Sequence, residues 1–191
     1  MAHMISTASG RAEMFYVGEV PWHGLGTRVE GSATSEVAIQ AAGLDWDVTT
    51  EPLYLADGRP VDRMACIRSD TKAILGTVSP RYCPVQNRDA FTFLDSLTMA
   101  NELHYETAGS LGQGERVWML ARVPGELRVA GTDDVTKPYL LLTNCHDGTG
   151  ALRCLFTGVR VVCNNTLMRA TRNQSEGLHL RHTGSIHAQI E

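Results

Sequence analysis

Short runs in which apolar and polar residues alternate cover much of the chain, and most of them end at glycine, proline, asparagine or aspartate. Alternation with a period of two indicates strands with one buried face, and the residues between the runs favour turns. Turns of this kind predict hairpins, so the sheet should be mainly antiparallel and the first half of the chain should form an antiparallel meander. The predicted strands lie near residues 14–17, 44–50, 63–68, 73–78, 104–110, 116–123, 127–129, 139–143, 151–163 and 178–181.

Three segments begin with residues that cap helices well, and each predicts a helix. They cover residues 35–42, 87–101 and 164–171, and the second begins at Asn87. A further cap at Ser185 predicts a short last helix. The fold class is therefore α+β, with a mainly antiparallel sheet of short strands and a few packed helices. The predicted core consists of apolar positions in periodic segments, namely Trp46, Phe91, Leu94, Trp118, Leu120, Leu141, Leu155 and Val161.

The chain has 191 residues, 43% of them hydrophobic and 20% charged, which fits one globular domain over residues 14–191. Residues 1–4 resemble a scar left by an expression vector before a natural start at Met4, and the small polar residues 5–13 should be loose. The sequence has neither an apolar run long enough to cross a membrane nor a signal peptide. We therefore expect a soluble, cytoplasmic protein without a membrane partner.

The five cysteines form an odd set without a Cys-x-x-Cys pair, and most lie in apolar runs. This usage is typical of reduced, small core residues. A zinc site would need Cys145, His146, Cys154 and Cys163, whose spacing matches no common zinc motif. We therefore predict no metal and no cofactor.

Charge is unevenly distributed along the chain. The net charge is −4, but residues 150–191 carry five arginines against Glu176 and Glu191, or +3, which leaves −7 for residues 1–149. Such asymmetry is compatible with a local phosphate-binding surface in an acidic protein, and equally with a solvated face of mixed charge. The candidate nucleic-acid ligands are Arg153, Arg160, Arg169 and Arg172.

The best candidate site is the polar segment 144–150, between two apolar strands. Its candidate residues for a pocket or interface are Asn144, His146 and Asp147. A hydrolase would use His146 as general base with Asp147, and His23 brought nearby from the first part of the chain. The alternative is a turn in which Asn144 and Asp147 bond to their own backbone while His146 is exposed. The segment is not a phosphate loop, because a strand follows Gly150 where that motif requires a helix.

A second candidate is the loop of residues 18–26, where glycines and a proline surround Trp22 and His23. Such a loop either fills the core or lines a pocket or interface. Since tryptophan is usually heavily buried, we favour a loop that fills the core.

Four blocks of sequence, in order along nearly the whole chain, resemble the phage/plasmid-related protein family, a domain of unknown function carried by phages, prophages and plasmids. They are Phe15–Gly26, Arg81–Asn87, Asn144 with His146–Gly148, and Arg160–Leu167. The resemblance implies a cytoplasmic accessory protein of a mobile element, acting in DNA replication, recombination or interference with host defence. Members of the family are typically longer at the C-terminus, so we expect a truncated end, and they often have serine in place of Cys145. Analogy to ring-forming single-strand annealing proteins makes a homo-oligomer compatible with this assignment.

These observations lead to three functional hypotheses. The first is a non-enzymatic protein that interacts with nucleic acid, including single-stranded DNA, through the four arginines. The second is a protein-binding module for a host or phage factor, with Trp22 and the 144–150 segment exposed. The third, which we favour least, is hydrolysis by His146 and Asp147.

Overall fold

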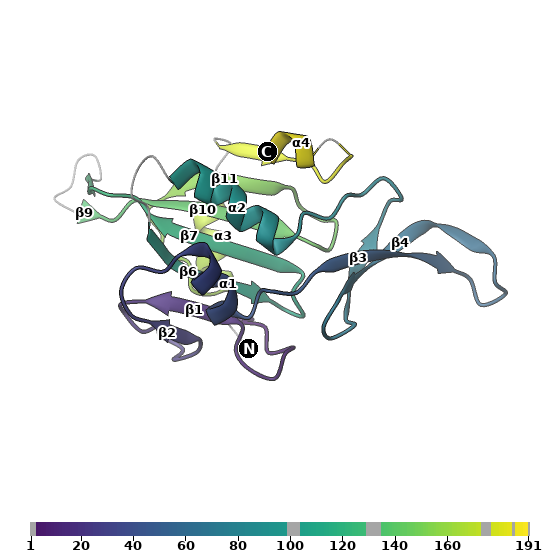
Figure 1. The fold of residues 1–191 in the computed structure, drawn as a ribbon, viewed down its shortest axis with the longest axis horizontal. Helices are drawn as coiled ribbons and strands as arrows, with labels where there is room; N and C mark the ends of the chain where they lie inside the picture. The colour runs from purple at the N-terminus through teal and green to yellow at the C-terminus, as the bar shows by residue number, and fades with distance from the viewer. Residues whose placement is uncertain (1–2, 99–103, 129–134, 173–176, 185, 191) are drawn as a thin grey trace.

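A seven-stranded sheet forms the body of the molecule, and helices lie on both of its faces (Figure 1). The computed structural model describes residues 3–98, 104–128, 135–172, 177–184 and 186–190. The helices are α1 (Ser35–Ala42), α2 (Asn87–Thr98), α3 (Asn164–Thr171) and α4 (His187–Ile190). The strands are β1 (Met14–Val17), β2 (Thr27–Val29), β3 (Val48–Tyr54), β4 (Pro60–Arg68), β5 (Ile74–Val78), β6 (His104–Leu111), β7 (Arg116–Arg122), β8 (Leu127–Arg128), β9 (Val135–Thr136), β10 (Tyr139–Cys145), β11 (Leu152–Thr157) and β12 (Leu178–Leu180). The predicted α+β class is confirmed.

The main sheet has the strand order β12-β11-β10-β7-β6-β1-β2. Its described neighbours pair antiparallel, except for β1 and β2, which are parallel. Strands β7 and β10 lie near the centre and are buried at almost every position. A strand that is covered on both faces needs apolar residues at successive positions, which explains the continuous apolar run at the start of β10.

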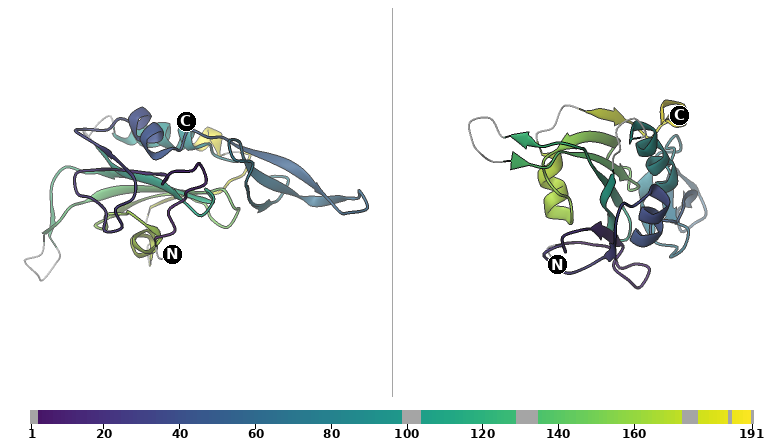
Figure 2. Two further views of the ribbon diagram at one scale, coloured as in Figure 1. Left: turned by 90° about the horizontal axis from the view of Figure 1, so that it is seen from below. Right: turned by 60° about the vertical axis from the view of Figure 1, so that its left-hand side comes forward.

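The two faces of this sheet belong to different hydrophobic cores. On β10, Leu140 and Leu142 pack in the core that includes α1 and α2, whereas Tyr139 and Leu141 pack in the core that includes α3. Neighbouring side chains on a strand point to opposite faces, which produces this division. Figure 2 shows α1 and α2 on one side of the sheet and α3 on the other. We call these sides the α1/α2 face and the α3 face.

The three predicted helices are confirmed, and their caps explain where they begin and end. Thr34 accepts a hydrogen bond from the backbone N–H of Val37, and Gly43 ends α1 with φ of 65°, which glycine adopts without steric strain. Residues 99–101 of the predicted second helix lie outside the described residues, as do Ser185 and Val129. None of the described helices is long and apolar enough to span a membrane.

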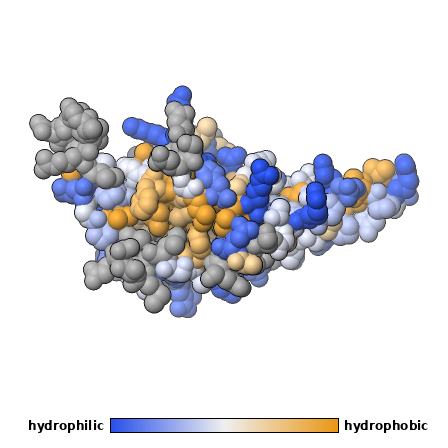
Figure 3. Space-filling view, turned by 90° about the horizontal axis from the view of Figure 1, so that it is seen from above, coloured by the Kyte–Doolittle hydropathy of each residue, from blue (hydrophilic) through white to orange (hydrophobic). Residues whose placement is uncertain are grey.

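Strands β3, β4 and β5 form a separate sheet that projects from the body as an arm (Figures 1 and 2). Because β5 pairs only with residues 64–67 of β4, the outer half of the arm is a two-stranded ribbon. Tyr54 and Leu55 are exposed on this ribbon. On the body, Phe156 of β11 is 66% exposed. Figure 3 shows that apolar side chains gather over the middle of the body as seen from above.

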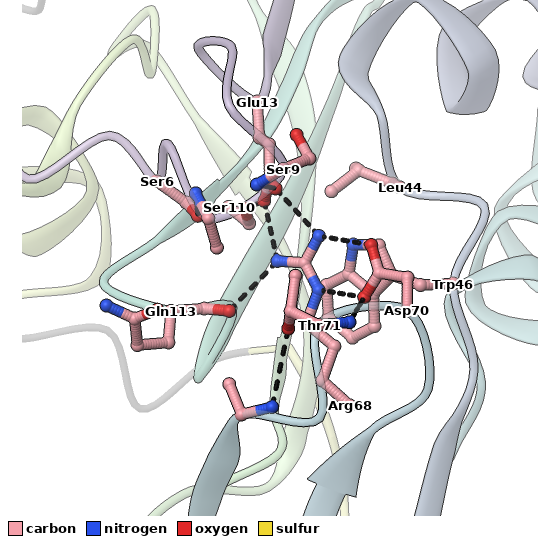
Figure 4. A network of polar contacts seen from close by, with 12 residues as sticks. Ser6, Ser9, Glu13, Leu44, Trp46, Arg68, Asp70, Thr71, Ser110 and Gln113 are labelled. Carbon is pink, nitrogen blue, oxygen red and sulfur yellow. Dashed lines mark hydrogen bonds and ion pairs between the residues drawn. The ribbon is translucent and has the colours of Figure 1, made fainter.

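Arg68, at the base of the arm, connects it to the body through a buried polar network (Figure 4). Its guanidinium donates to both carboxylate oxygens of Glu13 at 2.7 and 2.8 Å, and to both carboxylate oxygens of Asp70 at 2.7 and 3.0 Å. It also donates to the backbone oxygen of Gln113 at 2.9 Å and lies 4.3 Å from the ring centre of Trp46. Burial would raise the pKa of Glu13, but hydrogen bonds from Arg68 and Ser110 lower it below its ordinary value. The carboxylate is therefore ionised inside the protein.

All eight predicted core residues are buried, but three expectations about the strands and the N-terminus are wrong. The first half of the chain is not one antiparallel meander, because β1 pairs with β2 and β6, whereas β3, β4 and β5 form another sheet. Strand β3 begins at Val48, four residues later than predicted, and β11 ends at Thr157, six residues earlier than predicted. The segment 5–13 is packed against the body, since Ile5 and Glu13 are buried and the N–H of Ser6 donates to Ser110.

Candidate anion-binding pocket beside α3

The segment 144–150 begins as a strand, because β10 continues through Cys145. In the pairing with β7, Asn144 lies opposite Val117 and Cys145 lies opposite Arg116. Adjacent strand residues point to opposite faces, so Asn144 faces α1 and α2 while Cys145 faces α3. The candidate site is therefore divided between the two faces of the sheet.

On the α1/α2 face, the polar side chains hold the start of α2. Asn144 donates through Nδ2 to the backbone oxygen of Val85 at 2.9 Å, and Nε2 of His146 lies 3.0 Å from Oδ1 of Asn87. The ring of His146 also packs edge-on against Trp46, with 5.4 Å between ring centres. Burial lowers the pKa of His146 to about 3, with smaller contributions from His182 and Arg68. His146 is thus a neutral core histidine, and the alternative in which it is exposed is wrong.

This geometry does not support the hydrolase hypothesis. His146 is fully buried, whereas His23 lies on the other face, where its Nε2 is 2.8 Å from the backbone oxygen of Val162. The structure therefore does not bring His23 and His146 together, as a hydrolase would require. Asp147 accepts from the N–H and hydroxyl of Thr149 at 2.8 and 2.7 Å, which is the turn-forming role that we predicted as an alternative.

On the α3 face, a cavity of about 210 Å³ lies between the sheet and α3. The charged side chains in its lining are those of Arg116 and Arg153, and no described lining residue is a carboxylate. Hydroxyl groups come from Thr143, Thr149 and Thr171. The full lining is Arg116, Val117, Thr143, Asn144, Cys145, Thr149, Gly150, Ala151, Arg153, Leu167, Met168 and Thr171, and we call this cavity the α3 pocket.

Strand register explains why two arginines meet in the α3 pocket. Arg116 of β7 lies directly opposite Cys145, and Arg153 of β11 lies directly opposite Thr143. Since β10 is between these two strands, the guanidinium groups approach the pocket from its two sides, and directly opposite residues share a face. The arrangement suits an anion, because planar guanidinium groups donate to phosphate or carboxylate oxygens in fixed directions.

The thiol of Cys145 lies in the same pocket but is poorly suited to act as a nucleophile. Its pKa is raised to about 11, chiefly by burial and also by Asp147, although Arg116 and Arg153 act to lower it. The thiolate is the reactive form of cysteine, so a protonated thiol is unreactive at neutral pH.

The other predicted arginines have different surroundings. Arg169 and Arg172 are exposed on α3 and at its C-cap. Arg160 is separate from the pocket, because its Nε donates to Glu106 at 2.8 Å and its terminal nitrogen donates to the backbone oxygen of Val17 at 2.8 Å. Arg116 was missed from the sequence, since only the register of β7 and β10 brings it to the pocket.

The Trp22 side chain is 67% exposed, so the prediction that its loop fills the core is wrong. His23 supplies the anchor of that loop by its contact with Val162, and the Trp22 ring lies edge-on to His23 with 5.2 Å between ring centres. Trp22 therefore lies exposed beside an anchored residue.

Among the described residues, no group of three or more histidine, cysteine, aspartate or glutamate side chains is placed to hold a metal ion.

Comparison with known proteins gives one family and no individual relative. Searches of curated proteins and of solved structures find no match to the chain. A family model described as "Domain of unknown function (DUF932)" matches residues 74–191, which include β5 through α4 and every residue of the α3 pocket. Because this match covers more than half of the chain, the protein belongs to the DUF932 family.

Proposed function

We propose that this protein is a non-enzymatic nucleic-acid-binding protein that holds a backbone phosphate in the α3 pocket. The observation that carries the proposal is the lining of that pocket, to which Arg116 and Arg153 come from opposite sides of β10 and to which no described carboxylate contributes. A phosphodiester supplies two oxygens that accept hydrogen bonds from such guanidinium groups.

The surroundings of the pocket support phosphate over an uncharged ligand. Arg169 and Arg172 are exposed on α3, which borders the pocket, and they add positive charge outside it. The hydroxyl of Thr143 in the lining is a further donor to phosphate oxygens, whereas the hydroxyls of Thr149 and Thr171 donate to Asp147 and to the backbone oxygen of Leu167. Binding through arginines and phosphates releases counterions, so the affinity should fall steeply with salt.

The sequence resemblance supplies the biological part of the proposal. We place the protein as an accessory factor of a mobile genetic element, acting on nucleic acid that includes single-stranded DNA. Membership in the DUF932 family is compatible with this role, but the family has no assigned function that supports it.

A fluorescence-anisotropy titration tests the proposal, with labelled single-stranded and double-stranded DNA of about 20 nucleotides or base pairs. Salt should be set at about 50 mM and about 200 mM. We expect wild-type protein to bind more tightly at low salt, and the double variant Arg116→Gln/Arg153→Gln to lose most of the affinity and to have a salt slope smaller by about 1.

The matched control is Arg59→Gln/Arg63→Gln, which removes the same charge from the exposed arm. Thermal unfolding should be measured for both variants, so that loss of binding is not confused with loss of folding. If wild-type protein does not bind either DNA at low salt, or if the pocket and arm variants lose equal affinity, the proposed function is wrong.

A second candidate function is a protein-binding module, and the exposure of Trp22 favours it. Exposed tryptophan side chains often provide much of the binding energy when they enter a pocket of a partner. Acrylamide quenching of the chain with Trp46 and Trp118 replaced by phenylalanine would measure Trp22 alone. We expect strong quenching, and a shielded indole would remove the anchor that this hypothesis needs.

A further inference from the structure

A second cavity, of about 480 Å³, opens on the α3 face at the opposite end of β10. Tyr139, the first residue of β10, lines this cavity, whereas Thr143 and Cys145 line the α3 pocket. These odd-numbered residues share one face of the strand, so both cavities open on the same side of the sheet. We call the second cavity the Tyr139 pocket.

Charged side chains surround the buried Tyr139 ring. Arg122 lies directly opposite Tyr139 in the pairing of β7 with β10, and Arg160, Lys137, Glu19 and Glu106 also line the pocket. Burial raises the pKa of Tyr139, and Glu106, Arg160, Arg122 and Glu19 act on the same hydroxyl group. The phenol therefore remains a protonated hydrogen-bond donor near these charges.

The charges in the Tyr139 pocket are not balanced within the described residues. Arg160 neutralises Glu106, with 2.8 Å between Nε and Oε1, and both side chains are mostly buried. Arg122 and Lys137 are exposed at the rim, and no ion pair joins either of them to another described residue. Glu19 is the remaining carboxylate of the lining, so two unpaired cations face one unpaired anion. The pocket therefore favours an anionic group.

We propose that the Tyr139 pocket is a second phosphate-contact site, with Arg122 and Lys137 as its ligands, for the same nucleic-acid strand that enters the α3 pocket. This inference rests on the proposed function. The two pockets are separated by four to six residues of β10, which corresponds to about 14–20 Å along a strand.

That separation defines the length of nucleic acid that the protein covers. Successive phosphates of one stacked strand are about 3.4 Å apart along the axis, so the two pockets are bridged by about four to six nucleotides. This length agrees with the site sizes of about 4–16 nucleotides that single-strand binding domains commonly have. Arg169 and Arg172, exposed on α3, lie on the face that carries both pockets.

Oligothymidylates of two lengths test the inference, one of about 3 nucleotides and one of about 12 nucleotides. The short probe reaches one pocket at a time, whereas the long probe reaches both. A second contact made within one ligand acts at high effective concentration, so we expect the long probe to bind about 10- to 100-fold more tightly.

The double variant Arg122→Gln/Lys137→Gln should abolish this gain and leave the affinity for the short probe within about two-fold of the wild-type value after correction for the number of binding registers. It should also reduce the salt slope for the long probe by about 1, because one phosphate contact is removed. Arg63→Gln/Lys72→Gln, which removes the same charge from the arm and its base, is the matched control and should retain the gain.

The results separate the two proposals. If neither probe binds to wild-type protein, both proposals fail. If the long probe binds more tightly but the Arg122/Lys137 variant behaves like the control, the α3 pocket remains and the Tyr139 pocket is not a phosphate site. Equal affinity per register for the two probe lengths would also overturn the inference.

Discussion

Replacing Arg68 with methionine should lower the free energy of unfolding by about 3–5 kcal/mol, because it leaves an ionised carboxylate inside the protein without its partner. The side chains of Arg68 and Glu13 are both fully buried, and two hydrogen bonds of 2.7 and 2.8 Å join them. Methionine retains much of the apolar contact with Trp46 but provides no donor for Glu13. The loss should therefore be mainly electrostatic.

The magnitude comes chiefly from Glu13. Asp70 also loses its partner, but its side chain is 40% exposed and water solvates it in the variant, so its share is small. Ser110 still donates to Glu13 at 2.6 Å, which retains one of the hydrogen bonds that lower its pKa. The double variant Glu13→Gln/Arg68→Met removes the buried charge as well as its partner. It should therefore be more stable than the single variant Arg68→Met, even though it carries one more substitution.

Urea unfolding followed by circular dichroism measures these free energies. Repeating the titration at lower pH adds a second test, because a protonated Glu13 no longer needs a cation. The folded-state pKa of Glu13 is lowered by Arg68, so the stability from this pair is present above the unfolded pKa and is lost as pH falls. The loss of unfolding free energy caused by Arg68→Met should accordingly become smaller as the pH is lowered. A loss below about 1 kcal/mol at neutral pH, or additive effects of the two substitutions, would refute the electrostatic argument.

Two further predictions concern the core. His146→Gln should flatten the dependence of the unfolding free energy on pH. The pKa of His146 in the folded protein is about 3, which is below its value in the unfolded chain. Wild-type stability should therefore fall as the pH drops below about 6.5, by up to about 1.4 kcal/mol per pH unit. Equal slopes for variant and wild type in urea titrations would contradict this. Leu94→Ala should cost about 2–5 kcal/mol, since Leu94 is fully buried, whereas Thr92→Ala on the exposed side of α2 should change little. A loss below about 1 kcal/mol for Leu94→Ala would mean that its surroundings collapse into the space.

The sequence predicted the parts of the fold that depend on local patterns. Helix α1 lies where its cap and stop residues indicated, and the hairpin of β6 and β7 lies where alternation and glycines indicated. The arm was predicted as strands and turns, but its projection depends on β5 covering only part of β4. Such coverage is a property of strand pairing, and single-residue patterns carry little information about it.

The site was harder to predict because its parts meet only through long-range register. Arg153 was identified from the charge asymmetry, but Arg116 is 37 positions earlier and becomes its neighbour only because β10 lies between β7 and β11.

Trp22 was misplaced for another reason. The general tendency of tryptophan to be buried favoured a core position, whereas its neighbour His23 provides the loop's anchor.

The division of residues 144–150 between two faces determines how variants in this segment should be interpreted. Asn144 and His146 hold α2 on one face, and Cys145 and Thr149 line the α3 pocket on the other. The close approach of β5 leaves little freedom for the segment, since a Cβ on Gly76 would lie 2.6 Å from the backbone oxygen of Asp147. A substitution at His146, which is not part of the pocket lining, will therefore act on the pocket through the backbone. Loss of nucleic-acid binding in such a variant is evidence about folding, whereas variants of Arg116 and Arg153 test the pocket itself.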